Sequence, residues 1–92
     1  MAFAIIGTVA GGTAESDFAV TKAAGLIENP PAGILARLAG PMPGGWRVVS
    51  VWESREIWER FRTDRLDPAF KATGGPQPRF EEWDLQSVRF PT

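Results

Sequence analysis

Four side chains of the segment 44–54, GGWRVVSVWES, could together build a small-molecule site. Trp46, Val48, Ser50 and Trp52 are spaced two residues apart, so in a β-strand all four point to the same face. An apolar, aromatic wall with one hydroxyl to orient a ligand is typical of binding pockets. The same pattern also fits an ordinary core in which Ser50 bonds to the backbone. The residues alone leave both interpretations open.

Arg37 is the exceptional residue of the apolar segment 34–39, ILARLA. A buried arginine needs an anionic partner, an edge of the sheet, or a polar cavity in which it can hold an anionic group. One interpretation pairs it with Glu82 or Asp84 of a neighbouring strand. The acidic cluster of Glu81, Glu82 and Asp84 could in turn contain a general base, although its alternation also fits a solvated face.

The composition disfavours several classes of function. The chain has no histidine and no cysteine, which are common protein ligands of zinc, iron and haem. We therefore expect no metal and no cofactor. Ten basic and eleven acidic residues give a net charge of −1, which predicts no binding of nucleic acid. The apolar N-terminal run is too short to span a bilayer and has no preceding basic residue, so we expect a cytoplasmic protein that does not enter membranes.

Hydrophobic periodicity predicts four strands and two helices within one domain, residues 1–92. The strands are expected over 2–9, 33–39, 46–52 and 79–90. The first helix, capped by Thr13 or Ser16, is expected to end before Asn29-Pro30. Its inward side is predicted to carry Phe18, Val20, Ala23, Ala24 and Ile27.

The second helix is expected to begin after Ser54 as its N-cap. Ile57, Trp58 and Phe61 would form its buried face, and Asp67-Pro68 would interrupt it. The order β-α-β-β-α-β predicts an α+β, ferredoxin-like fold with one antiparallel sheet and two helices on one face.

The second face of this sheet is also predicted to be apolar. Val49 and Val51 point away from Trp46 and Trp52, yet both pairs are hydrophobic. Two helices cover one side only, so a homodimer joined through the other side is expected.

The chain resembles the dimeric α/β-barrel superfamily, specifically its small proteins of the antibiotic biosynthesis monooxygenase type. The resemblance covers most of the sequence and rests on these segments: Gly33-Ile34-Leu35 before Ala39-Gly40-Pro41, Gly45-Trp46-Arg47-Val48-Val49, Trp52-Glu53-Ser54 with Phe61, and Leu66 before Pro68.

This resemblance implies a dimer with a ligand cavity in each subunit between sheet and helices. Trp52 would look into the cavity, and alternation would carry Ser50, Val48 and Trp46 with it. Members of the family include oxygenases that act on aromatic polyketides without metal or flavin, because the deprotonated substrate itself reduces O₂. Related proteins often have a histidine at the position of Arg37 and another near Phe61, and several have an asparagine in the first strand. This chain has none of these, which disfavours the haem degradation found elsewhere in the family.

The sequence therefore leads to three hypotheses. The first is a cofactor-independent monooxygenase of small-molecule metabolism that binds an aromatic or polyketide-like substrate. In it Arg37, Ser50 and Trp52 would be catalytic, and Trp46, Val48, Trp58 and Phe61 would bind substrate. The second is a non-oxidative cyclase, isomerase or epoxide-opening enzyme that uses the same cavity. The third is a ligand-binding dimer without catalysis.

Overall fold

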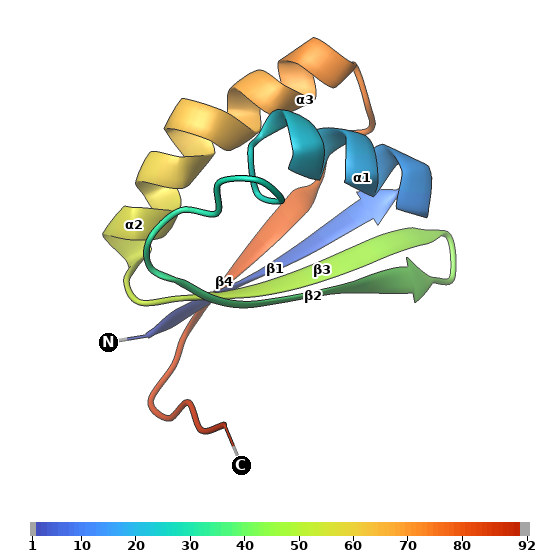
Figure 1. The fold of residues 1–92 in the computed structure, drawn as a ribbon. Helices are drawn as coiled ribbons and strands as arrows, with labels where there is room; N and C mark the ends of the chain where they lie inside the picture. The colour runs from blue at the N-terminus through green and yellow to red at the C-terminus, as the bar shows by residue number, and fades with distance from the viewer. Residues whose placement is uncertain (1, 91–92) are drawn as a thin grey trace.

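The computed structural model describes residues 2–90, and Figure 1 shows its helices above a twisted sheet. In chain order the elements are β1 (Phe3–Ala10), α1 (Ala14–Ala23), β2 (Ile34–Met42), β3 (Gly45–Trp52), α2 (Arg55–Phe61), a π-helical turn η1 (Arg62–Leu66), α3 (Asp67–Thr73) and β4 (Arg79–Asp84). In the described part of the chain, no helix has the length and apolar character needed to cross a bilayer.

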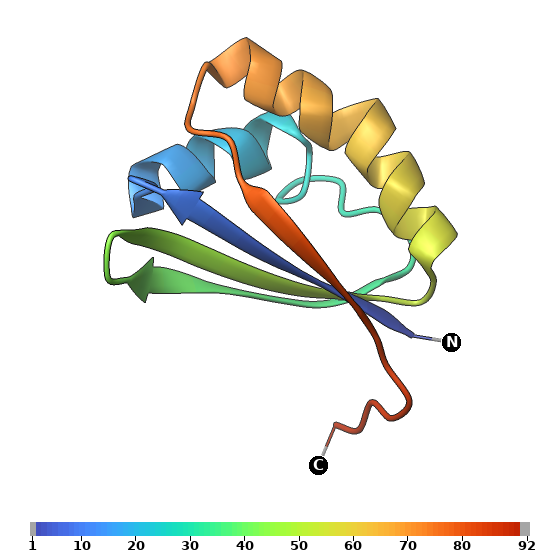
Figure 2. The same ribbon diagram turned by 180° about the vertical axis from the view of Figure 1, so that it is seen from behind.

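The four strands form one antiparallel sheet in the order β2-β3-β1-β4. All helices lie on the same face of this sheet, as Figures 1 and 2 show from opposite sides. This confirms the predicted α+β, ferredoxin-like fold. The expected association of two sheets concerns a second copy of the chain and stays a prediction.

Helix α1 begins with a capping box that uses both residues considered as caps. Thr13 is the N-cap and accepts a hydrogen bond from the Ser16 backbone amide, while the Ser16 hydroxyl accepts one from the Thr13 amide. The predicted inward side is wrong at three of its five residues, because Phe18 and Ile27 are 59% and 54% exposed and Ala23 is exposed as well. A helix this short, Ala14–Ala23, cannot bring Ile27 onto the same stripe.

Helix α2 begins as expected, with the Ser54 hydroxyl accepting a hydrogen bond from the Ile57 amide. Trp58 and Phe61 are buried against the sheet. Asp67-Pro68 does not interrupt the helical path, contrary to the prediction. Five residues of π-helix precede it, and Pro68 lies in the first turn of α3, where its missing amide hydrogen is tolerated.

The π-helical turn changes which side chains face the sheet. The buried positions of the continuous helical segment are Trp58, Phe61, Leu66 and Ala69. The step of five between Phe61 and Leu66 is longer than an α-helix provides, and the wider turn supplies it. Leu66 therefore faces inward, at a place where a regular α-helix would direct Arg65.

Strand β4 ends at Asp84, six residues before the predicted end at Phe90. The Leu85 amide still donates to the Ala2 carbonyl oxygen, and the chain then leaves the sheet on the side away from the helices (Figures 1 and 2). Residues 85–90 are therefore not part of the sheet, and their apolar side chains belong to neither of its faces. Phe90 is 62% exposed.

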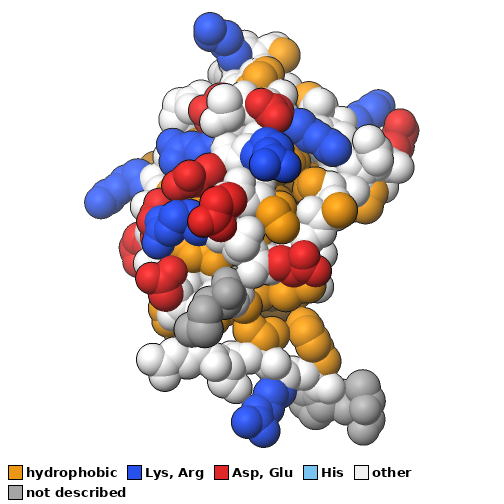
Figure 3. Space-filling view, turned by 90° about the vertical axis from the view of Figure 1, so that its left-hand side faces the viewer, with side chains coloured by type: hydrophobic (Ala, Val, Ile, Leu, Met, Phe, Trp, Pro, Cys, Tyr) orange, Lys and Arg blue, Asp and Glu red, His pale blue; other side chains and the backbone are white. Residues whose placement is uncertain are grey.

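The face without helices carries an apolar surface that we call the open face: Ile6, Ala36, Leu38, Val49, Val51 and Trp83. Leu38 and Trp83 on it are 61% and 56% exposed. Figure 3 shows charged side chains of both signs over the upper part of one end of the molecule and apolar side chains gathered lower, beside the C-terminal segment.

The π-helical turn predicts a specific pattern of stability. Leu66→Ala should lower the free energy of unfolding by about 2 to 5 kcal/mol, because it empties a packed position. Thr63→Ala, an exposed change in the same turn, should alter it by less than about 0.5 kcal/mol. Urea unfolding at one fixed protein concentration measures both. Equal losses would contradict the inward position of Leu66.

Candidate functional site

A cavity of about 70 Å³ lies between the sheet and the helices. All seven residues predicted to form a site line it: Arg37, Trp46, Val48, Ser50, Trp52, Trp58 and Phe61. A single water needs only about 10 to 15 Å³, so this space can admit several waters or part of a small ring. The structure thus brings the predicted residues together, while their roles remain predictions.

The pairing of β3 with β1 explains how one strand supplies four of these residues. Ser50 lies opposite Ile5 and Trp52 opposite Phe3, on the face covered by helices. Ser50 is 6% and Trp52 1% exposed. The Trp52 indole Nε1 donates a hydrogen bond of 2.8 Å to Ser50 Oγ. Ser50 therefore has a side-chain partner, rather than the backbone partner considered for a core serine, and its own hydroxyl proton is not used in this bond.

Aromatic rings form the wall between β3 and the helices. The ring of Trp52 lies 5.5 Å from that of Trp58 and 5.2 Å from that of Phe61, measured between centroids. Phe80 of β4 meets Trp58 edge to face at 5.2 Å. These separations are in the range of favourable aromatic pairs. The cavity wall is therefore continuous from β3 across the helices to β4.

Phe80 was not among the predicted site residues. It lies opposite Gly7 in the pairing of β1 with β4. A β-carbon at Gly7 would be only 3.3 Å from the Phe80 ring, so the glycine gives the ring room over β1. Gly7, a glycine within the otherwise apolar strand β1, is the feature of the sequence that could have indicated a large side chain lying over this strand.

Trp46 carries a polar atom that is not satisfied. In residues 2–90 its Nε1 is the buried side-chain nitrogen or oxygen that has no hydrogen-bond partner. An unpaired buried donor costs about 1 to 3 kcal/mol, and an oxygen acceptor on a ligand would remove that penalty. Its presence at the cavity wall is consistent with a ligand that carries a carbonyl or hydroxyl group.

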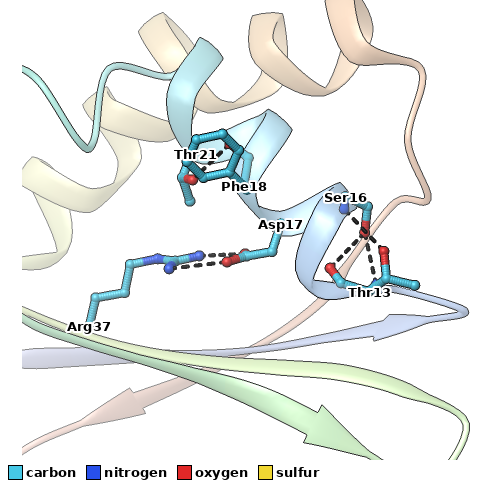
Figure 4. A network of polar contacts seen from close by, with 6 residues as sticks. All are labelled: Thr13, Ser16, Asp17, Phe18, Thr21 and Arg37. Carbon is cyan, nitrogen blue, oxygen red and sulfur yellow. Dashed lines mark hydrogen bonds and ion pairs between the residues drawn. The ribbon is translucent and has the colours of Figure 1, made fainter.

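Arg37 points into the cavity and binds Asp17 of α1, not Glu82 or Asp84 (Figure 4). The distances are 2.6 Å from Nη2 to Oδ1 and 3.4 Å from Nη1 to Oδ2. Their side chains are 26% and 19% exposed, so solvent reaches the pair. The expected pairing was wrong because Arg37 is on the edge strand β2, and both β3 and β1 lie between this strand and β4.

Asp17 was missed as a site residue. Acidic residues are common in the first turn of a helix because they interact favourably with the helix dipole. Asp17 lies in that turn, so its sequence position gave no reason to expect an ion pair with another element. Nothing local in the sequence connects it to a residue twenty positions later.

The acidic cluster of β4 belongs to a different surface. Glu82 and Asp84 both accept hydrogen bonds from Arg55 at the start of α2. The bond to Glu82 is the main cause that raises the pKa of the Arg55 guanidinium. Glu81 lies opposite Ile6 and so faces away from the helices. Among residues 2–90, none of these three carboxylates lines the cavity, which removes them as candidates for a base there.

The arrangement can bind a mostly apolar ligand and offer it a few polar contacts. The Arg37 guanidinium, the Ser50 hydroxyl and the Trp46 indole are donors, and the Asp17 carboxylate is an acceptor. No group of three or more metal-ligating side chains occurs in the part of the chain that the structure describes.

Several solved structures share this arrangement of elements. SnoaB, a cofactor-independent oxygenase from Streptomyces nogalater, is 14% identical with a TM-score of 0.65, over 95% of this chain and 93% of that one. A candidate antibiotic biosynthesis monooxygenase from Chloroflexus aurantiacus is 13% identical with a TM-score of 0.70, over 98% of both chains. Another from Caulobacter crescentus is 17% identical with a TM-score of 0.69, over 96% and 91%.

The chain has the fold of the antibiotic biosynthesis monooxygenases. No family model and no curated sequence matches it. The ferredoxin-like fold predicted from the sequence is therefore shared with these structures.

The hydrogen bond between Ser50 and Trp52 predicts a measurable energetic coupling between these two side chains. Ser50→Ala should destabilise the protein by about 1 to 3 kcal/mol, because it leaves the buried Trp52 donor without an acceptor. In a double-mutant cycle with Trp52→Phe, the coupling should be about 1 kcal/mol. Thermal or urea unfolding of the four proteins measures it.

Ser87→Ala supplies the matched control, since Ser87 is exposed and lies beyond β4. It should change the free energy of unfolding by less than about 0.5 kcal/mol. Additive effects of Ser50→Ala and Trp52→Phe would mean that the bond contributes nothing to stability.

Proposed function

We propose that the chain is a cofactor-independent monooxygenase of the antibiotic biosynthesis monooxygenase type, acting on an aromatic or polyketide-like small molecule. The observation that carries the proposal is the cavity, which is lined by Trp46, Trp52 and Trp58 and contains few polar groups. The shared fold with SnoaB, itself a cofactor-independent oxygenase, supports it.

The proposed reaction requires little from the protein beyond binding and charge stabilisation. A ring CH₂ that is conjugated with a ketone through the flanking aromatic rings loses a proton, and the resulting enolate reduces O₂. In the overall step the CH₂ becomes a carbonyl group and the second oxygen atom leaves as water. The substrate supplies all the electrons. The site must hold the enolate oxygen and keep bulk water away from the carbanion.

The cavity residues have distinct places in this proposal. Arg37 and the free hydroxyl proton of Ser50 are the donors for the enolate oxygen. Trp52 lies against the ring and keeps Ser50 oriented through their hydrogen bond. The remaining predicted residues, Trp46, Val48, Trp58 and Phe61, enclose the apolar part of the substrate.

We further propose that the protein works in the cytoplasm as a homodimer joined through the open face. All four strands contribute apolar residues to this face, although Arg47 and Glu81 also lie on it, and Leu38 and Trp83 protrude from it. A second copy of the same surface is complementary to it in character. Burial of these residues would complete the coverage of a sheet that has helices on one side only.

The oxygenase proposal predicts O₂ uptake with anthrone above the rate of its autoxidation. Arg37→Ala should lower kcat/KM by about 100-fold, because the developing enolate loses its cationic donor. An oxygen electrode measures the uptake, and absorbance of the quinone product confirms the stoichiometry.

Arg60→Ala is the matched control, since Arg60 is an exposed arginine of α2 that does not line the cavity. It should retain the wild-type rate. A folded wild-type protein that takes up no O₂ with anthrone would falsify the oxygenase version. Turnover under anaerobic conditions would favour the non-oxidative alternative instead, and ligand-dependent quenching of tryptophan fluorescence without product would favour a binding protein.

The dimer proposal predicts that Leu38→Asp dissociates the protein. A charge placed in an apolar interface should raise the dimer dissociation constant by about 100-fold or more. Sedimentation velocity over a dilution series measures the change. Ile27→Asp, on an apolar residue that is equally exposed but on the helical side, should leave the dimer intact. A monomeric wild type at high concentration would contradict the proposal.

A further inference from the structure

We propose that Asp17 is the general base that removes the proton from the substrate, and that its ion pair with Arg37 makes the transfer possible. The inference rests on the proposed function, because it names the group that forms the enolate on which oxidation depends. The Asp17 carboxylate of this pair lines the cavity, and the proposed function gives it no role.

The position of Asp17 makes it the carboxylate within reach of a bound ligand. It is the fourth residue of α1, and this turn of the helix lies over the helix-covered face of the sheet (Figure 4). In residues 2–90 it is the carboxylate side chain that lines the cavity. Glu82 and Asp84 are held by Arg55 instead.

The ion pair leaves both partners with free capacity. A carboxylate has about four lone-pair sites, and Arg37 occupies one on each oxygen. A guanidinium has five N–H donors, of which two bind Asp17. A ligand can therefore place its acidic C–H or O–H group at the carboxylate and its oxygen at the guanidinium.

The proton transfer keeps the net charge of the site constant. The C–H or O–H bond of the ligand breaks, its electron pair stays on the ligand as an enolate or phenolate, and an O–H bond forms on Asp17. Arg37 loses one anionic partner just as a second anion forms beside it. The cation thus moves from pairing with the carboxylate to pairing with the ligand oxygen, and no oxidant is needed for this step.

This mechanism defines a substrate class. The ligand enters as a neutral acid, either an enolisable ketone whose acidic CH₂ is attached to an aromatic ring or a phenol with an oxygen near the acidic position. A permanent anion is disfavoured, because the Asp17 carboxylate already neutralises Arg37 and repels a second negative charge.

The decisive experiment follows proton exchange without oxygen. The probe is 2-tetralone, a bicyclic enolisable ketone, in D₂O buffer under argon, and NMR follows the loss of its C1 proton signal. The wild-type protein should accelerate the exchange, and Asp17→Asn should reduce the acceleration by about 100-fold or more. Glu15→Gln, an exposed change in the same turn of α1, should retain it.

A second measurement separates a base from a merely structural residue. Asp17→Asn frees Arg37, so it should bind 2-naphthoate more tightly than the wild type does, as measured by tryptophan fluorescence. A structural role would weaken exchange and binding alike. The double variant Asp17→Asn/Arg37→Gln leaves no unpaired charge, and it should lose both the exchange and the gain in anion binding.

The results also distinguish this inference from the proposed function. In one outcome, proton exchange depends on Asp17 while the protein takes up no O₂ with anthrone. This combination would overturn the proposed oxygenase activity but would support Asp17 as the general base. A wild-type protein that leaves exchange at the buffer rate overturns the inference. The inference is also overturned if Asp17→Asn, or the double variant, exchanges the proton as fast as the wild type does.

Discussion

The packing of Trp52 against Trp58 and Phe61 is the contact on which the rest of the structure depends. It joins the centre of the sheet to the helical segment, with ring centroids 5.5 and 5.2 Å apart. Burial of each such side chain contributes roughly 1.5 to 3 kcal/mol. In a chain of 92 residues, which buries a limited share of its surface, these contacts are a large part of the available stabilisation. The hydrogen bond to Ser50 then fixes the orientation of the central indole.

The same large rings explain why a cavity remains beside them. Planar side chains held at tilted angles do not fill the space between sheet and helices completely, and the residual volume is about 70 Å³. A charge beside such an apolar space is tolerated only with a partner. Arg37 and Asp17 meet this requirement across two elements, so the pair also ties α1 to β2.

The sequence predicts the fold and most of the cavity because both follow from local patterns. Alternation along 46–52 places four side chains on one face, and the register with β1 confirms it. Patterns of this kind do not encode contacts between distant elements, so Asp17 could not be found as the partner of Arg37. Nor could they reveal the π-helical turn, which shifts the inward position to Leu66 without a local breaker.

The four tryptophans lie in two different environments, the cavity and the open face. Trp46, Trp52 and Trp58 line the cavity, whereas Trp83 protrudes from the open face. Indole emission depends on the polarity around the ring, and the chain contains no tyrosine to complicate it. Replacing Trp83 alone leaves a spectrum that reports on events inside the fold. The protein thus carries separate optical reporters for its interior and for its uncovered surface.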